Sequence, residues 1–447
     1  MQLGEKNGMN PKTTPQVVII GAGFGGLNAA LSLAHYPVRI TLIDRRNHHN
    51  FQPLLYQVAT GGLSPGEIAT PIRWIVRKHR NIEVLLGEVN ELDLQRRILK
   101  FGDREISYDY LVVAAGASHA YFGHDDWEPF APGLKTIEDA LEIRRRVLLA
   151  FELAERYAAS TGENVQLNFV IVGGGPTGVE LAGALAEIAH RVLPEEFNSI
   201  DTRRARIILL EGGPRILPAY SEDLSRSAEQ QLRVLGVEVQ TSTMVTGIEP
   251  AAVHMGATRL PAAVILWAAG VAASPLGKKL GAPIDRAGRV LVDPDLSIPG
   301  HLEVFVIGDL AALKDKNGQL VPGVAAAAIQ QGKATARSIA NDLQGKPRRD
   351  FHYVNKGSLA TIGRAAAIAE FGKIHISGFI AWLSWLFVHI FFLIGFRNRI
   401  MVMIQWAWSY FTFERGAQLI TGNQTLPSWS ELMNRQVAGR EKSDKLP

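Results

Sequence analysis

The sequence predicts an α/β protein built from two doubly wound parallel sheets and a smaller helical C-terminal region. Two short apolar runs, Val17–Ile20 and Asn168–Val172, each lead into a Gly-rich turn that opens a helix rich in Ala and Leu. A second strand followed by an acidic residue comes after each helix. Continuous apolar runs are typical of strands buried on both faces, so these repeats indicate two βαβ units in one chain.

The remaining elements follow the same alternation of strands and helices. In chain order they are Leu27–His35, Val38–Ile43, Tyr110–Ala115, Val179–Val192, Arg206–Leu210, Ala263–Ala268, Glu303–Ile307 and Ala325–Leu343. The second βαβ unit lies inside the first domain, which is therefore discontinuous. We expect residues 15–120 and 286–346 to form the first domain, residues 121–285 the second, and residues 347–447 a C-terminal region.

Composition limits the chemistry. The 447 residues are too many for one ordinary core, and 47% hydrophobic with 20% charged residues is a globular balance. The chain has no Cys, which excludes disulfides, thiolate zinc sites, iron–sulfur clusters and a catalytic thiol, and we expect no metal site. The first sixteen residues are polar and contain no apolar segment, so they do not resemble a secretory signal.

The first Gly-rich turn has the pattern of a dinucleotide-binding loop. Gly21, Gly23 and Gly26 stand between a strand and a helix, and Asp44 follows the next strand. In this pattern the first Gly allows a tight turn, the second lets the backbone approach a pyrophosphate, and the third lets helix and strand pack closely. The acid is placed to accept a hydrogen bond from an adenosine ribose. The whole predicted loop comprises Gly21, Ala22, Gly23, Phe24, Gly25 and Gly26.

The second turn repeats this pattern with Gly173, Gly175 and Gly178, and Glu211 takes the place of the ribose-reading acid. A carboxylate there repels a 2′-phosphate, which favours NADH over NADPH. Nearby basic residues (203, 204 and 206) weaken that inference. Glu180, in the first turn of the following helix, either interacts with the helix dipole or stands beside a nicotinamide.

Two dinucleotide-binding, Rossmann-like domains imply two dinucleotides. FAD in the first domain that accepts hydride from NADH in the second is the simplest combination. Two further strand ends of the first domain, at Gly116 and at Gly308-Asp309, are predicted FAD contacts, with Asp309 on the ribitol; a solvent-exposed strand end is the alternative for the latter. Redox Cys pairs are absent, so we expect the electron acceptor to reach the flavin itself.

The C-terminal region points to a membrane. From residue 351 onward there are ten Lys/Arg against five Asp/Glu, and five of the eight Trp lie there. The segment Ile374–Phe396 contains 23 residues without a formal charge. It is long enough to span a bilayer, but the Arg and aromatic residues that follow favour helices lying on the lipid surface. Burial in a homodimer core is the third interpretation. Stacking aromatics interleaved with Lys are missing, so we expect no nucleic acid partner. A lipid-soluble quinone becomes the expected acceptor.

The chain resembles the type II NADH:quinone oxidoreductases, a family of single-subunit, non-pumping NADH dehydrogenases, from about Pro15 to Gly422. The most particular matching segments are IDRRNHHNFQPLLYQVATGGLSP after the first βαβ unit and WLFVHIFFLIGFRNR with WAWSYFTF near the C-terminus. The shorter ones are GAGFGGLNAA, GGGPTGVELAGALAE, LWAAGV, VFVIGD, AAIQQG and KGSLATIGR.

This resemblance implies FAD contacts at Val89 and Asp309 and places Glu180 at the nicotinamide. It also implies that Gln330 and Lys356 lie where quinone meets the flavin. Many members carry a further Gln four residues before the one that matches Gln330; here that residue is Ala326. The family implies a monotopic enzyme on the cytoplasmic face of the inner membrane.

We therefore expect transfer of two electrons from NADH through FAD to a membrane quinone, without proton pumping. Two alternatives stay open at this point: a reductase of a soluble acceptor that the C-terminal region merely localises, and a non-catalytic, nucleotide-sensing flavoprotein of the membrane.

Overall fold

The computed structural model describes residues 14–316, 318–412 and 415–422. The prediction that residues 1–16 contain no secretory signal falls almost wholly on residues outside these ranges. The chain divides into two compact units. The first holds residues up to His49, Thr70–Ser118 and Val271–Lys356; the second holds Asn50–Ala69, His119–Gly270 and the described residues from Gly357 onward. These limits differ from those of the predicted domains, because the C-terminal region belongs to the second unit.

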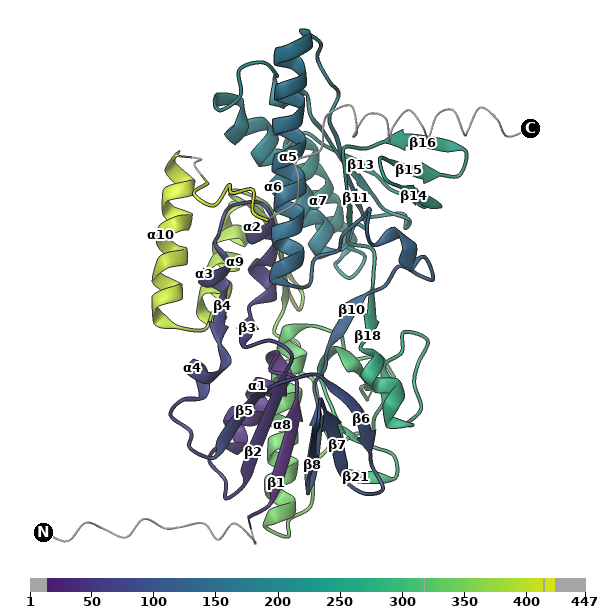
Figure 1. Cartoon of the computed structure of the whole chain (residues 1–447), viewed down its shortest axis with the longest axis vertical. Coiled ribbons are helices and arrows are strands. Elements are labelled where there is room, and N and C mark those ends of the chain that lie inside the picture. The colour runs from purple at the N-terminus through teal and green to yellow at the C-terminus, as the bar shows by residue number, and fades with distance from the viewer. Residues whose placement is uncertain (1–13, 317, 413–414, 423–447) are drawn as a thin grey trace, which may run out of the picture. The chain divides into compact units, whose positions relative to one another are not determined.

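The first unit is built on a six-stranded sheet (Figure 1). Its order is β20 (Ser297–Ile298), β21 (His301–Val306), β9 (Tyr110–Val113), β1 (Gln16–Ile20), β2 (Arg39–Asp44) and β5 (Ile82–Leu86). All neighbours are parallel except the short edge strand β20. The predicted strands of this domain are thus present, and their apolar runs fill the middle of the sheet.

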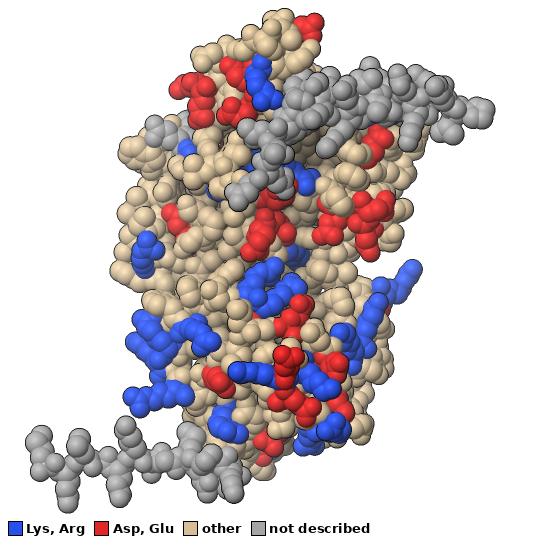
Figure 2. Space-filling view, in the orientation of Figure 1, with Lys and Arg blue, Asp and Glu red and all other residues tan. Residues whose placement is uncertain are grey.

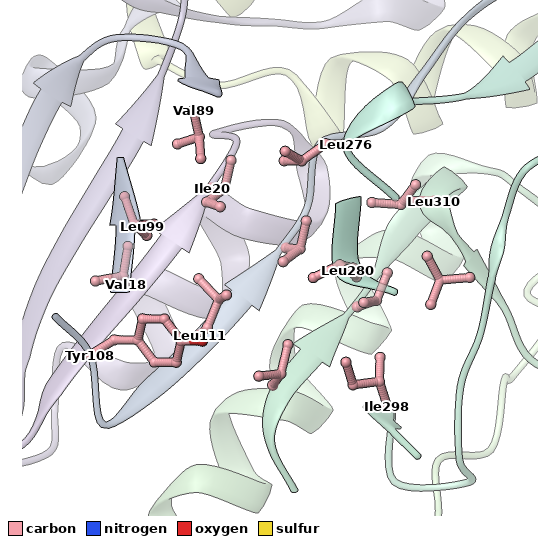
Figure 3. Close-up of a cluster of buried hydrophobic side chains, with 14 of the residues drawn as sticks. Val18, Ile20, Val89, Leu99, Tyr108, Leu111, Leu276, Leu280, Ile298 and Leu310 are labelled. Carbon is pink, nitrogen blue, oxygen red and sulfur yellow. The ribbon is translucent and has the colours of Figure 1, made fainter. Parts of the chain in front are cut away.

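Helices and a small antiparallel sheet cover the six-stranded sheet. Helices α1 (Phe24–Leu33) and α8 (Ala325–Leu343) pack against each other. They approach closely, since a Cβ on Gly332 would lie 2.2 Å from the carbonyl oxygen of Gly25. The antiparallel sheet consists of β6 (Val89–Asp93), β7 (Ile98–Phe101) and β8 (Arg104–Ser107). Its apolar side chains join those of β1, β9 and β21 in one buried cluster (Figure 3).

Several smaller elements complete the first unit and the passages between the two units. The first unit also contains helix α4 (Ile72–Val76) and the parallel pair β19 (Val290–Leu291) and β22 (Ala311–Ala312). Four short strands lie where the chain passes from one unit to the other: β3 (His48–Asn50), β4 (Ala69–Pro71), β10 (Ala117–His119) and β18 (Val271–Ala273).

The second unit contains a four-stranded parallel sheet in the order β13 (Val237–Gln240), β12 (Arg206–Leu210), β11 (Asn168–Val172) and β17 (Val264–Trp267). Its helices are α5 (Ile137–Thr161), α6 (Pro176–Glu187) and α7 (Glu222–Val234). A three-stranded meander follows, formed by β14 (Gly247–Glu249), β15 (Ala252–Met255) and β16 (Thr258–Pro261). The predicted helix Val179–Val192 ends as an α-helix at Glu187 and continues as one π-helical turn, Ile188–Val192.

The C-terminal region completes the second unit. It forms the antiparallel sheet β23 (Ser358–Gly363), β24 (Ala366–Phe371) and β25 (Ile374–Ser377), followed by α9 (Phe379–Phe392) and α10 (Phe396–Thr412). Strand β23 packs on α6 so closely that a Cβ on Gly183 would lie 1.6 Å from the carbonyl oxygen of Ile362. The short helices α2 (Leu55–Ala59) and α3 (Pro65–Ile68) also belong here, and α3 packs on α10.

The uncharged run Ile374–Phe396 is therefore not one helix. Its first residues form β25, and Gly378, at a φ of +74°, separates that strand from α9. The residues of β25 pair with β24 in the sheet, the 14 residues that follow Gly378 form α9, and the last residue of the run begins α10. Among the helices in the described part of the chain, none combines the length and the apolar composition needed to cross a bilayer.

Candidate functional site

The first Gly-rich loop has space at the position where a pyrophosphate is expected. Gly21 has a φ of +96°, and a Cβ there would lie 2.3 Å from the carbonyl oxygen of Ala114. A Cβ on Gly26 would lie 1.8 Å from the carbonyl oxygen of Gly21, so helix and strand pack as the motif requires. Gly23 has an ordinary φ of −68°, and a Cβ there would meet nothing within 4 Å. The first and third Gly serve the turn and its packing, while the second faces open space that fits a phosphate group.

Asp44 fixes this loop from the end of β2. Its carboxylate accepts the backbone N–H of Ala22 at 2.6 Å and that of Arg46 at 2.7 Å. A carboxylate has lone pairs beyond these two, so it retains the capacity to accept ribose hydroxyls. The predicted role of Asp44 at an adenosine ribose is compatible with this geometry, and Asp44 also shapes the loop.

His49 of β3 contacts this loop, and the glycine pattern did not indicate it. It is buried, its Nδ1 lies 2.9 Å from the carbonyl oxygen of Ala22, and its ring meets that of Phe24 edge-on at 5.0 Å. Burial lowers the pKa of His49, which keeps the imidazole neutral at pH 7. Its buried Nε2 has no hydrogen-bond partner among the described residues. A polar ligand atom beside the loop would satisfy it.

The second loop, in the second unit, repeats this construction. Gly173 has a φ of +110°, and a Cβ on Gly178 would lie 1.8 Å from the carbonyl oxygen of Gly173. Gly175, at a φ of −72°, again faces open space. The carboxylate of Glu211 accepts the N–H of Gly174 and that of Gly213, each at 2.6 Å. The two loops therefore share one design, with an acid from the next strand bound to the loop backbone.

One of the basic residues near Glu211 in sequence, Arg206, is paired elsewhere. Arg206 makes a bidentate pair with Glu238 at 2.6 Å, at the start of β12. Glu211 follows the end of this strand, roughly 16 Å away at about 3.3 Å per residue. The preference for NADH over NADPH, which rests on Glu211, stays a prediction.

The other predicted FAD contacts lie in the first unit at strand ends. Gly116 and Gly308 both have a positive φ, and Asp309 is partly buried in the short turn after β21. The side chain of Val89 is buried in the core cluster beside Ile20 (Figure 3), so a contact from this residue to FAD would come from its backbone. One residue that the sequence did not indicate is Gln331, whose buried Oε1 accepts the N–H of Gly308 at 2.6 Å.

The predicted quinone residues Gln330 and Lys356 also belong to the first unit. The amide of Gln330 makes two hydrogen bonds to the backbone of Val354, each at 3.0 Å. It therefore fastens the segment that leads to Lys356, which is itself exposed. The side chain of Gln330 therefore has a structural role in holding this segment. Its contact with quinone stays a prediction.

A cavity of about 100 Å³ lies in the second unit and contains Glu180. Its walls come from α2, α6, β23, α9 and α10. The aromatic part of its lining consists of Tyr56, Trp382, Trp385, Trp406 and Tyr410. The buried indole Nε1 of Trp385 has no partner among the described residues. The lining thus combines aromatic side chains with polar and charged ones, among them Glu180, Glu187, Arg364 and Arg415.

Burial in this cavity favours the uncharged form of Glu180. Part of the residue's surface stays accessible, but its carboxyl group is enclosed by protein. Burial raises the pKa of Glu180 to about 8, although the backbone of Thr361 donates a hydrogen bond to it. The carboxyl group is therefore mainly protonated at neutral pH and can donate a hydrogen bond or a proton.

Two polar networks hold the cavity walls together. Glu187 accepts the backbone N–H of Arg364 and, at 2.9 Å, the guanidinium of Arg415, which also donates to the carbonyl oxygen of Thr60 at 3.0 Å. The guanidinium of Arg364 in turn stacks on Tyr410 of α10 at 4.3 Å. Removing one partner of a buried ion pair strongly lowers the stability of a protein, so this network ties α10 and the residues after it to α6.

The second network begins in α10. The indole N–H of Trp406 donates to Gln57 at 2.7 Å, and the amide of Gln57 donates to the hydroxyl of Tyr56 at 2.8 Å. Neither network was foreseen, because residues 56–60, 187, 364 and 415 are far apart in sequence and no motif links them. The only signal was the family resemblance, whose segments FQPLLYQVATGGLSP, GGGPTGVELAGALAE, KGSLATIGR and WAWSYFTF contain most of these residues.

Comparisons with known proteins agree on one family. A family model described as Pyridine nucleotide-disulphide oxidoreductase matches residues 15–332, and one described as NDH2 C-terminal domain matches residues 355–415. The chain is 46% identical to the type II NADH:quinone oxidoreductase NdhA of Mycobacterium tuberculosis, over 95% of this chain and 93% of that protein. It is 31% identical to the type II NADH:quinone oxidoreductase of Haemophilus influenzae, over 80% and 88% of the two chains.

Solved structures show the same fold. The structure of NDH2 from Plasmodium falciparum in complex with NADH aligns with a TM-score of 0.81 and 21% identity, over 92% of this chain and all of that one. The sulfide:quinone oxidoreductase of Aquifex aeolicus aligns with a TM-score of 0.69 and 20% identity, over 87% and 92% of the two chains. At these identities the likeness concerns the fold alone.

Proposed function

The chain belongs to the family of type II NADH:quinone oxidoreductases, and from this membership we propose that it passes two electrons from NADH through FAD to a membrane quinone without pumping protons. The broader family model mentions disulphide chemistry, but a chain with no Cys has no dithiol for it. FAD, when bound, supplies the hydride acceptor that no side chain can provide. The protein's part is to bind, orient and protect the reactants.

The two Gly-rich loops support this assignment of cofactor and substrate. We assign the loop Gly21–Gly26, with Asp44, His49 and the turn at Asp309, to FAD. The loop containing Gly175, with Glu211, is assigned to NADH. In each loop the middle Gly leaves open space for a phosphate, and the backbone around it is fixed by the acid of the next strand.

The observation that carries the quinone assignment is the aromatic cavity around Glu180. Its walls include Trp385 on α9 and Trp406 on α10, so a flat, apolar ring has surfaces to stack against. Reduction of a quinone to a quinol takes up two protons. Glu180, whose carboxyl group is mainly protonated at neutral pH, gives one of them or holds a substrate carbonyl by a hydrogen bond in this proposal. Its place at the nicotinamide, which the resemblance implies, stays a prediction.

Surface exposure on α9 and α10 supports a lipid contact. Large apolar side chains with at least about two fifths of their surface exposed are Phe379, Ile380, Leu383, Phe387, Phe391, Phe392, Phe396, Ile400, Met403, Ile404, Trp408 and Phe411. Soluble surfaces rarely gather so many, and interfacial helices do. We propose peripheral attachment through this face. The cytoplasmic side of the membrane and a homodimer stay predictions from the sequence.

The experiment that tests the quinone site compares two Trp residues on one helix. Trp406 lines the cavity, whereas Trp408 is exposed and does not. We expect Trp406→Leu to raise the KM for a short-chain quinone about ten-fold, which corresponds to the loss of about 1.4 kcal/mol of binding. Reduction of ferricyanide by NADH should hardly change. Trp408→Leu is the control, and its quinone KM should equal that of the wild type.

Equal effects of Trp406→Leu on quinone and ferricyanide reduction would mean that the cavity does not bind quinone and would favour a soluble acceptor. The sensing alternative is checked separately with the wild type. Anaerobic NADH should bleach the visible band of the flavin, and quinone should restore it. If NADH does not bleach the flavin band, the assignment of the protein as an enzyme is wrong.

A further inference from the structure

A basic patch in the first unit surrounds the short helix α4. Residues 69–81 contain Arg73, Arg77, Lys78 and Arg80 and no acidic residue. Ile72 and Val76, four positions apart, are buried and fix the inner face of the helix. The four basic side chains are all exposed. Figure 2, which shares the orientation of Figure 1, shows Lys and Arg side chains gathered where Figure 1 labels α4. We call these four residues and Trp74 the α4 patch.

An aromatic ring is displayed at the centre of the α4 patch. Trp74 is 48% exposed, which is unusual for so large an apolar side chain. The guanidinium of Arg77 lies 4.0 Å from the centre of the indole ring and donates a hydrogen bond to the carbonyl oxygen of Trp74 at 2.8 Å. The Arg side chain thus covers one side of the indole and holds it on the surface.

The charges of the α4 patch are not neutralised by nearby acids. Across the described residues, no Asp or Glu oxygen lies within 4.0 Å of Arg73, Lys78 or Arg80. The antiparallel sheet of the same unit behaves differently, because Arg96 pairs with Glu105 and Lys100 pairs with Glu91. The cations gathered around one exposed Trp therefore form a surface that attracts anions.

We propose that the α4 patch binds a bilayer containing anionic phospholipid, as a membrane contact of the first unit in addition to the one proposed for α9 and α10 of the second. Trp and Arg together are typical of the interfacial zone of membranes, where the indole lies at headgroup depth and the cation meets phosphate. One aromatic residue offers no stacking platform for successive bases, so nucleic acid is the less suitable polyanion.

This contact goes beyond the proposed function, because it adds selectivity for lipid charge. It predicts that the first unit contributes a salt-sensitive share of membrane affinity, whereas the apolar face of α9 and α10 contributes a share that salt does not weaken. Electron transfer to a water-soluble quinone analogue in detergent is independent of the α4 patch. Failure of this proposal and failure of the proposed function are therefore separable.

The test measures flotation of the full-length, FAD-loaded protein with two kinds of vesicle, phosphatidylcholine alone and phosphatidylcholine with about 30 mol% phosphatidylglycerol. The variant carries Arg73→Gln, Arg77→Gln, Lys78→Gln and Arg80→Gln. Each basic side chain near an anionic surface strengthens binding about five-fold, so we expect the loss of four to lower the affinity for anionic vesicles by roughly two orders of magnitude or more. Binding to neutral vesicles should stay unchanged, and raised salt should abolish the difference.

A control variant removes the same charge elsewhere in the first unit, through Arg39→Gln, Arg96→Gln, Lys100→Gln and Arg104→Gln. It should bind anionic vesicles like the wild type. A second variant, Trp74→Ala, keeps every charge and should lose part of the affinity. Equal losses in the patch and control variants would show an effect of net charge and overturn the proposal, as would unchanged binding of the patch variant. Tighter binding of a duplex oligonucleotide than of anionic vesicles, lost in the patch variant, would assign the patch to nucleic acid instead.

Discussion

At the scale of the residue, burial decides what the ionisable side chains of the candidate site can do. Glu180 is an ordinary carboxylic acid in sequence, but the aromatic cavity raises its pKa to about 8. His49 is kept neutral by burial beside the first loop. Both groups are thereby placed to exchange hydrogen bonds with uncharged parts of a ligand. The residue types could be read from the sequence, whereas the shifts depend on walls contributed by distant segments.

The raised pKa of Glu180 predicts a pH dependence of stability. The folded protein retains a proton that the unfolded chain releases near pH 4.5, so this group's contribution declines as the pH rises from about 4.5 to about 8. Glu180→Gln removes that titration. We expect thermal unfolding of the FAD-loaded variant to lose less stability than the wild type across this pH range, by a few degrees in Tm.

Glu67→Gln serves as the control for Glu180→Gln, because Glu67 caps the start of α3 and lies outside the cavity lining. Its Tm should follow the same pH trend as that of the wild type. Parallel curves for Glu180→Gln and the wild type would contradict the assigned pKa of Glu180.

At the scale of the element, each Gly-rich loop separates two roles that sequence alone assigns together. In the first loop, Gly26 serves packing within the protein, since its missing Cβ makes room for the carbonyl oxygen of Gly21. Gly23 serves a ligand, because its backbone is unstrained and its side-chain position is open. Two single substitutions therefore distinguish the fold of the loop from its function.

We expect Gly23→Ala to leave the thermal stability of FAD-free protein within about 0.5 kcal/mol of the wild type, as for surface changes. Its affinity for FAD should fall at least about ten-fold because the methyl group enters the phosphate space. Gly26→Ala should destabilise FAD-free protein by about 2 kcal/mol or more through overpacking. Unfolding curves and the flavin content of purified protein measure both effects. Retention of FAD by Gly23→Ala would contradict the pyrophosphate position.

The sequence predicted the parallel strands and the helix Ala325–Leu343 because their apolar runs and glycines are local signals. The uncharged run Ile374–Phe396 could not be divided into its elements from the sequence, because its apolar character hides the change from strand to helix at Gly378. The helix Ile137–Thr161 was not identified, although Thr136 with Asp139 and the left-handed Gly162 mark its ends. The cavity could not be foreseen, since Glu187 and Arg415 meet only in the folded chain.

At the scale of the whole molecule, the C-terminal region is part of the second unit and not an appended anchor. Strand β23 packs on α6, strand β24 packs on α7, and Arg415 binds Glu187 at the end of α6. If the C-terminal region merely localised a reductase of a soluble acceptor, truncation near Pro347 would spare reduction of that acceptor. The structure indicates otherwise, because such a truncation uncovers the face of α6 that follows the NADH-assigned loop.

Truncation after Lys356 should therefore abolish ferricyanide reduction together with quinone reduction. It should also lower Tm by about 10 °C or more, because the apolar faces of α6 and α7 that β23 and β24 cover would be exposed to water. A chain ending at Gly422 is the control, since it keeps every interaction described above, and it should reduce ferricyanide at the wild-type rate. Near-normal ferricyanide reduction by the chain that ends at Lys356 would show that the second unit folds without β23–β25.

The carboxylates that bind the two Gly-rich loops have a consequence for turnover. Asp44 bonds to Ala22 and Glu211 to Gly174 within the protein itself, so the shape of each loop is specified by the chain. The conformational entropy of these loops is then lost when the chain folds and not each time a dinucleotide arrives. For a cofactor that stays bound this matters little, but a nicotinamide nucleotide exchanges in every cycle. A loop that needs no reordering lets product leave and the next NADH enter without a refolding step between them.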